Sequence, residues 1–93
     1  MKLLMCKSCG DVFNLAFKTK KCSCGKTKGK YKKDGIYANY SGDCVPLCFH
    51  NTSLINAIAI QQDNDVSYPE EYYGERFEAW ICPANSDRFV RSD

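Results

Sequence analysis

The sequence predicts an α+β fold: a small antiparallel β-sheet carrying one helix, within a single domain of residues 1–93. Short segments with alternating apolar residues, separated by glycine-containing turns, favour strands over most of the chain. Residues 52–62 have the apolar spacing of a helix instead. A chain of 93 residues buries only about 60–65% of its unfolded surface, so its core is thin and a further source of stability is expected.

The first part, residues 1–41, is predicted to contain two cysteine-bearing turns, one strand and a hairpin. A short apolar segment leads into the first cysteine pair. Apolar residues then alternate over residues 12–17 (Val12, Phe13, Leu15 and Phe17), which predicts a strand. Asp34-Gly35 is the strongest two-residue turn signal in the chain and lies between KGKYKK and IYANY, so a hairpin is predicted there.

The second part, residues 42–93, is predicted to add a strand, a helix, a loop and a strand. CVPLCF, residues 44–49, has the composition of a strand, and Pro46 favours a position at a sheet edge. Good N-cap residues at 51–53 precede LINAIAIQQ, so a helix is expected over residues 52–62.

Behind this helix the sequence predicts a loop, a last strand and a polar tail. DNDVSYPEEYYG, residues 63–74, has loop composition. RFEAWIC, residues 76–82, alternates so that Phe77, Ala79 and Ile81 share one face, which favours a buried strand face. The tail after Pro83 is polar and is expected to be loosely held.

The N-terminal segment and the cysteine content together indicate a reducing compartment. Only three consecutive apolar residues, Leu3 to Met5, precede the first cysteine, too few for the apolar region of a signal peptide. No segment approaches the length of a membrane span. We therefore expect a cytoplasmic protein without a membrane partner, and clustered cysteines there bind metal more often than they form disulfides.

Four of the seven cysteines have the spacing of a metal site. They fall as Cys6-x2-Cys9-x12-Cys22-x-Cys24, and a glycine follows each pair at once. Two ligands on a tight turn supply half of a tetrahedral shell, and a glycine that tolerates positive φ lets backbone N–H groups point at the sulfurs. The pattern predicts one structural Zn²⁺ with all four positions filled by protein.

In these motifs the chain resembles the zinc-ribbon proteins. CKSCG looks like their first zinc knuckle, and KCSCG matches the second except that one spacer residue is missing. The resemblance covers residues 3–26 and implies an N-terminal zinc ribbon over residues 1–41, ahead of the sheet and helix. The chain is also similar to uncharacterised short zinc-ribbon proteins of bacteria and phages, which is compatible with a phage gene and brings no known activity with it.

The remaining cysteines and the single histidine do not predict a second site. If CVPLCFH is extended, Cys44 and Cys48 lie about 13 Å apart, too far to share an ion. One histidine, His50, leaves only a Cys48–His50 pair for nucleophilic catalysis, and neither a deaminase signature nor a phosphate-binding glycine motif is present. We expect no enzymatic activity, and Cys44, Cys48 and Cys82 are expected to be packed or exposed thiols.

Charge is divided unevenly between the two halves. Residues 1–33 carry ten lysines against Asp11 alone, and residues 34–93 carry ten acids against three arginines. Either the halves pack together and neutralise each other, or the lysines form a basic face for a polyanion. In the second case Lys18–Lys33 would contact nucleic acid without sequence readout, since the patch lacks arginine. The contacts would be Lys20, Lys21, Lys26, Lys28, Lys30, Tyr31, Lys32 and Lys33.

The acidic, aromatic second half favours a protein partner. SYPEEYYGERFEAW supplies Tyr72, Tyr73 and Trp80, the residue types that anchor protein interfaces, although the same aromatics could instead cover a thin core. The leading hypothesis is thus a small zinc-binding adaptor or inhibitor that acts through protein–protein interaction. The main alternative is a nucleic-acid-binding accessory factor, and a third is a thiol-based redox switch that uses Cys44, Cys48 or Cys82. The sequence leaves the oligomeric state open.

Overall fold

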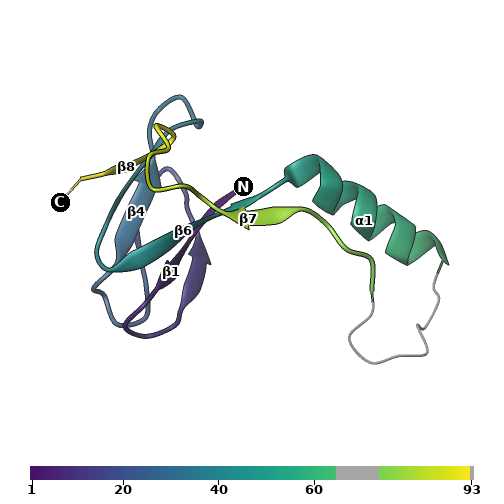
Figure 1. Cartoon of the computed structure of the whole chain (residues 1–93), viewed down its shortest axis with the longest axis horizontal. Helices are drawn as coiled ribbons and strands as arrows, with labels where there is room; N and C mark the ends of the chain where they lie inside the picture. The colour runs from purple at the N-terminus through teal and green to yellow at the C-terminus, as the bar shows by residue number, and fades with distance from the viewer. Residues whose placement is uncertain (65–73, 93) are drawn as a thin grey trace.

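A computed structural model describes residues 1–64 and 74–92 as two four-stranded sheets and one helix (Figure 1). The α+β class is therefore confirmed. In chain order the elements are β1 (Lys2–Cys6), β2 (Val12–Asn14), β3 (Lys20–Lys21), β4 (Lys28–Tyr31), β5 (Ala38–Ser41), β6 (Cys44–Phe49), α1 (Asn51–Asn64), β7 (Ala79–Ile81) and β8 (Phe89–Arg91).

Each sheet combines strands from both parts of the chain. The first sheet has the order β2-β1-β6-β7 and is antiparallel throughout, with Cys6 opposite Cys44. The second has the order β3-β4-β5-β8; its first three strands form an antiparallel meander, and β8 runs parallel to β5. Chain segments on either side of residue 41 thus hold each other in place.

The core lies between the sheets and is small. Leu4, Leu15, Ala38, Cys82 and Phe89 form one buried cluster that draws residues from both sheets. Phe89 belongs to β8, so the expectation of a loose tail after Pro83 is wrong over these residues. The tail is polar in composition, but the Phe89 ring packs against Tyr40 in an edge-to-face contact, with ring centroids 5.8 Å apart.

Two further strand predictions need correction. The predicted strand over residues 12–17 ends at Asn14, and of its later apolar residues Leu15 is buried whereas Phe17 is 65% exposed. The predicted buried face of residues 76–82 does not form, because β7 covers only residues 79–81 at the sheet edge and all three are exposed. An edge strand without a covering layer shows its apolar side chains to solvent.

Pro46 does not place β6 at an edge, as the sequence predicts, because β6 lies between β1 and β7. The Cys82 N–H donates to the Pro46 carbonyl at 2.9 Å, on the β7 side. The N–H and C=O of one strand residue point toward the same neighbouring strand, so an N–H at position 46 would point toward β7. The pairing of β6 with β7 ends at Leu47, next to this position, so the missing N–H of proline costs little. The ladder between β1 and β6 therefore loses no hydrogen bond.

The helix is confirmed and projects away from the sheets (Figure 1). It begins next to His50, whose carbonyl accepts hydrogen bonds from the Leu54 N–H at 3.0 Å and the Ser53 hydroxyl at 2.9 Å. The chain returns along α1 from Gly74 into β7 (Figure 1). We call α1 with residues 74–81 the arm. No helix among the described residues has both the length and the apolar character needed to cross a bilayer.

Candidate metal centre and neighbouring surfaces

The structure brings the four predicted cysteines together. The sulfurs of Cys6, Cys9, Cys22 and Cys24 all lie within 4.8 Å of one another. Cys24 Sγ is 3.7 Å from Cys6 Sγ and 3.4 Å from Cys22 Sγ. One cysteine of each pair is buried and the other exposed. Residues from two separate turns thus form one cluster that could hold a metal ion.

Both turns close between a cysteine and the residue five positions later. In the first, the Cys6 N–H donates to the Asp11 carbonyl at 2.9 Å, and Gly10 has a φ of 76°. In the second, the Cys22 N–H donates to the Thr27 carbonyl at 3.0 Å. The missing spacer residue therefore does not shorten the second turn. It moves the positive-φ glycine one position earlier and leaves the closure unchanged.

The second turn has the same backbone hydrogen bonds as the hairpin loop at residues 32–37. The Gly25 N–H donates to the Cys22 carbonyl, and the Gly35 N–H donates to the Lys32 carbonyl, both at 3.0 Å. The Lys32 N–H donates to the Tyr37 carbonyl at 2.8 Å and closes a four-residue loop, so the two-residue turn predicted at Asp34-Gly35 is wrong. In the loop at 32–37, Asp34 lies at the position that Cys24 has in the turn at 22–27. Its Oδ1 accepts a hydrogen bond from the Ile36 N–H at 2.9 Å.

Asp11, the single acidic residue among residues 1–33, links the two cysteine turns. Its Oδ2 accepts hydrogen bonds from the Ser23 N–H at 2.9 Å and the Ser23 hydroxyl at 3.1 Å. Ser23 is the spacer between Cys22 and Cys24. A carboxylate on one turn therefore orients the ligand-bearing backbone of the other, in the manner of an outer-shell group at a metal site.

The electrostatics of the cluster favour ionisation of some of its thiols. The Thr27 hydroxyl, assisted by backbone N–H groups of the first turn, lowers the pKa of Cys6 to about 6 against the effect of burial. Burial raises the pKa of Cys22, but the net shift is downward because the Thr27 N–H donates to its sulfur at 3.3 Å. The Lys26 N–H lowers the pKa of Cys24, yet the neighbouring sulfurs and burial raise it to about 11. The thiolates of Cys6 and Cys22 therefore oppose ionisation of Cys24. A bound cation would neutralise their charge and remove this opposition.

Thr27 is a buried polar residue whose role depends on the cluster. Its side chain is fully buried, and its hydroxyl has no hydrogen bond of ordinary geometry to any described residue. The hydroxyl is close enough to two sulfurs to lower the pKa of Cys6 and to oppose the burial that raises the pKa of Cys44. A buried hydroxyl without a partner is costly, so this residue fits a site where the thiolate is the permanent acceptor.

The other cysteines and His50 lie outside the cluster. In the described part of the chain, Cys6, Cys9, Cys22 and Cys24 are the one group of metal-ligating side chains close enough to share an ion. Burial is the main cause that raises the pKa of both Cys44 and Cys48. His50 instead supports the arm: its Nδ1 accepts from the Ser53 N–H at 3.3 Å and lies 3.8 Å from the Glu78 carboxylate.

The predicted lysine patch is only partly gathered in space. Lys30, Tyr31, Lys32 and Lys33 line one cavity. Lys20 lies elsewhere and donates to Asn14 Oδ1 at 2.8 Å, and Lys21, Lys26 and Lys28 do not line that cavity. Sequence reasoning missed two residues of this cavity, Phe17 and Asn39. The position of Phe17 directly before the lysine run was a signal, but its apolar spacing assigned it to a strand.

Among the predicted protein-contact residues, Tyr72 and Tyr73 lie outside the described residues. Trp80 is 47% exposed on β7 and lines a cavity of about 250 Å³ with Cys48 and Cys82. Neutralisation of the two halves by direct pairing is limited: Lys7–Asp43, at 3.6 Å, is the one salt bridge of a lysine to a carboxylate within the described ranges.

Comparison with known proteins identifies no relative of this chain. No protein-family model matches it, and neither a curated protein nor a solved structure shows significant similarity to it. Three features of the chain bear on its function: the cysteine cluster, the arm and the cavity at Phe17.

Proposed function

We propose that the protein is a zinc-stabilised adaptor or inhibitor that binds another protein through its arm and has no catalytic role. The observation that carries this proposal is the arm itself. It combines a helix that is apolar on more than one side with an exposed edge strand. It projects from the sheets that hold the cysteine cluster (Figure 1).

Zinc fits the cluster better than other metals. Tetrahedral zinc has Zn–S bonds of about 2.3 Å, which separates neighbouring sulfurs by about 3.8 Å. The separations of 3.7 Å and 3.4 Å at Cys24 are close to this value. Four thiolates form a soft donor set, which disfavours magnesium and calcium. Cys6, Cys9, Cys22 and Cys24 would hold the ion, and the chemistry that it supplies is structural, because four protein ligands leave no position for a reacting water.

The site ties together parts of the chain that the core alone holds weakly. Cys6 ends β1, and the Cys22–Cys24 turn joins β3 to β4, so the cluster connects one sheet to the other. The apolar core is a small cluster of buried side chains. Binding free energy of a structural metal adds directly to folding free energy, so the ion substitutes for the missing core.

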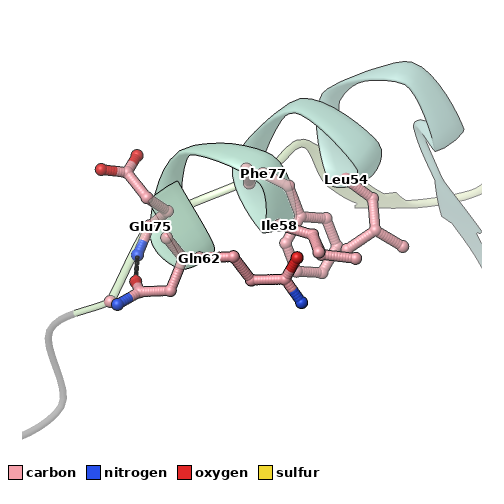
Figure 2. A pocket seen from close by; sticks show the side chains of 8 residues that line it. Leu54, Ile58, Gln62, Glu75 and Phe77 are labelled. Carbon is pink, nitrogen blue, oxygen red and sulfur yellow. Dashed lines mark hydrogen bonds between the residues drawn. The ribbon is translucent and has the colours of Figure 1, made fainter. Parts of the chain in front are cut away.

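The helix of the arm exposes isoleucines that a monomer would be expected to cover. Ile55 is 65% exposed, and Ile58 and Ile60 are also exposed. From Asn51 to Gln62 the helix has no charged residue. The returning chain lies along one side of the helix, where Leu54, Ile58 and Phe77 line a groove of about 380 Å³ (Figure 2). A helix that is apolar beyond the side that faces the returning chain is characteristic of a surface that a partner buries.

The apolar surface continues from the helix onto β7. Trp80 and Ile81 are 47% and 69% exposed there. β7 is the edge of the first sheet and has one strand neighbour, β6. A partner that covers the arm could therefore bury side chains and also pair with a strand edge. Its contact face is expected to be apolar, since the helix offers no charge to match.

The test is affinity capture with a matched set of variants, followed by reconstitution. Ile55→Asp and Ile60→Asp change exposed side chains of the arm and should leave metal content and circular dichroism unchanged. Met5→Asp is the control, because Met5 is an exposed apolar residue on β1, away from the arm. The wild type and the control should retain one partner from extracts of the native host in stoichiometric amounts. The arm variants should lose it.

Binding of the purified partner should then weaken at least about tenfold in each arm variant, since a buried isoleucine contributes roughly 1.5–3 kcal/mol. Equal binding by all variants would refute the role of the arm. Light scattering separates a further outcome: a stable homodimer that the aspartates dissociate would assign the arm to a second copy of the chain and overturn the adaptor proposal.

A further inference from the structure

A cavity of about 440 Å³ lies at the second sheet, and none of its lining residues belongs to the arm or to the cysteine cluster. Its lining combines two aromatic rings, three lysines and one amide: Phe17, Tyr31, Lys30, Lys32, Lys33 and Asn39. No acidic side chain is among them. Cations and flat apolar rings around one concave surface match a ligand that carries phosphates and aromatic bases.

The Phe17 ring packs against neighbouring residues on one side and is exposed to solvent on the other. Its ring centroid lies 5.8 Å from that of Tyr31, at an interplanar angle of 40°. A Cβ on Gly35 would come within 3.3 Å of the Phe17 ring, so the hairpin loop at residues 32–37 packs directly against this ring. The Tyr31 hydroxyl in turn accepts a hydrogen bond from the Lys2 N–H at 3.0 Å. At 65% exposure, Phe17 presents a fixed ring to solvent.

The polar groups of the cavity are available to a ligand. None of Lys30, Lys32 and Lys33 forms a salt bridge within the described part of the chain. Asp34 directs Oδ1 at backbone N–H groups of its own loop, at 2.9 and 3.1 Å. These N–H groups are the main cause that lowers the pKa of Asp34, and Lys32 makes a smaller contribution to the same shift. Asn39 lies opposite Lys30 on the neighbouring strand. Its amide has no hydrogen bond to another described residue and can donate and accept.

We infer that this cavity binds single-stranded nucleic acid. One unpaired base stacks on Phe17, the Asn39 amide contacts the edge of that base, and the three lysines contact the flanking phosphates. A duplex does not fit this arrangement, because its base faces are already stacked. Lysines alone would suit any polyanion, but an exposed, supported ring and an unpaired amide between them favour a base. The inference is independent of the proposed function, since the arm contributes no residue to this cavity.

The experiment is a fluorescence-anisotropy titration of labelled oligothymidine and oligouridine of ~12 nucleotides, with the metal-loaded full chain, at ~25 to ~200 mM salt. Contact with three phosphates predicts a slope of log K against log salt of about −2. Phe17→Ala should weaken binding about 5- to 150-fold with this slope unchanged, and Phe17→Tyr should restore it, because stacking is worth about 1–3 kcal/mol per base. Lys30→Gln with Lys32→Gln and Lys33→Gln should bring the slope close to zero.

Matched controls separate the cavity from the general basic charge. Lys21→Gln removes one positive charge at an exposed lysine that does not line the cavity, and it is compared with each single cavity substitution. Trp80→Leu removes an exposed aromatic ring from the arm. Neither should change the affinity by more than about twofold. No binding at the lowest salt overturns the inference, and so does binding that Phe17→Ala leaves intact. Equal competition by inorganic polyphosphate or by anionic phospholipid vesicles overturns it too, because the ligand would then be any polyanion.

Discussion

Thr27→Val tests the reasoning about the cysteine cluster most directly. The side chain is fully buried, and valine has nearly the same shape, so the substitution removes the hydroxyl and little else. We expect that hydroxyl to donate to the Cys6 thiolate in the metal-bound protein, and hydrogen bonds to charged groups contribute about 1.5–3 kcal/mol. Loss of an outer-shell partner typically lowers metal affinity about 10- to 100-fold, or roughly 1.4–2.8 kcal/mol. The two ranges agree, so we expect zinc affinity to fall by that factor.

The assay is competition for zinc with a chromophoric chelator, under reducing conditions. Thr19→Val is the control, because Thr19 is exposed and is not among the residues that shift the pKa of Cys6, Cys22 or Cys24. In the metal-free protein the effect should depend on pH, because the pKa of Cys6 is lowered to about 6: valine should destabilise the fold above this pH, where the sulfur is a thiolate, and leave stability unchanged or raise it below this pH. Unchanged zinc affinity, or a destabilisation of the metal-free protein that is the same at about pH 5 and about pH 8, would show that Thr27 acts through packing and not through the thiolate.

Three further predictions follow from the same region. Cys24→Ser should abolish stoichiometric zinc binding in elemental analysis and lower the melting temperature sharply. Cys44→Ser is the control and should retain one ion per chain, because Cys44 lies opposite Cys6 but outside the cluster. Two ions per chain in the wild type would contradict this prediction. Asp11→Ala should cost about 1 kcal/mol through loss of the link to the second turn and speed zinc release to a chelator, while an unchanged rate would mean that the link is not maintained in solution. Gly42→Ala should destabilise the fold by about 3 kcal/mol, or roughly 12–24 °C in melting temperature, because a Cβ would overlap the Lys26 carbonyl at a φ of 103°; a shift of a few degrees would refute the close approach.

The features that depend on local sequence were predictable. Cysteine spacing with the following glycines identified all four members of the cluster, and N-cap residues before an apolar repeat located α1. Residues 44–49 form a strand as their composition indicates. These patterns are local because turn geometry and helix capping involve neighbours in the chain.

The features that depend on distant contacts were not predictable. Leu3 to Met5 looked like a short apolar entry, yet β1 is an interior strand because two segments far apart in sequence pair with it. Phe89 belongs to the core although its neighbours are polar. Phe17 shows the reverse: its alternation with Leu15 and Phe13 indicated a strand, but the strand ends at Asn14 and the Phe17 ring is exposed to solvent. Alternation gives the side of a strand and cannot say whether another layer covers it.

The shared hydrogen bonding of residues 22–27 and 32–37 bears on how the metal is acquired. The loop at 32–37 holds its shape with a glycine, a closing backbone pair and a carboxylate, and it contains no thiol. The cysteine turn at 22–27 uses the same backbone pattern, so its conformation does not depend on an ion. The metal-free chain should therefore already present Cys22 and Cys24 as a prepared half-site. An arriving ion would then meet two sulfurs that the backbone has already placed, so binding would not have to pay for ordering this turn.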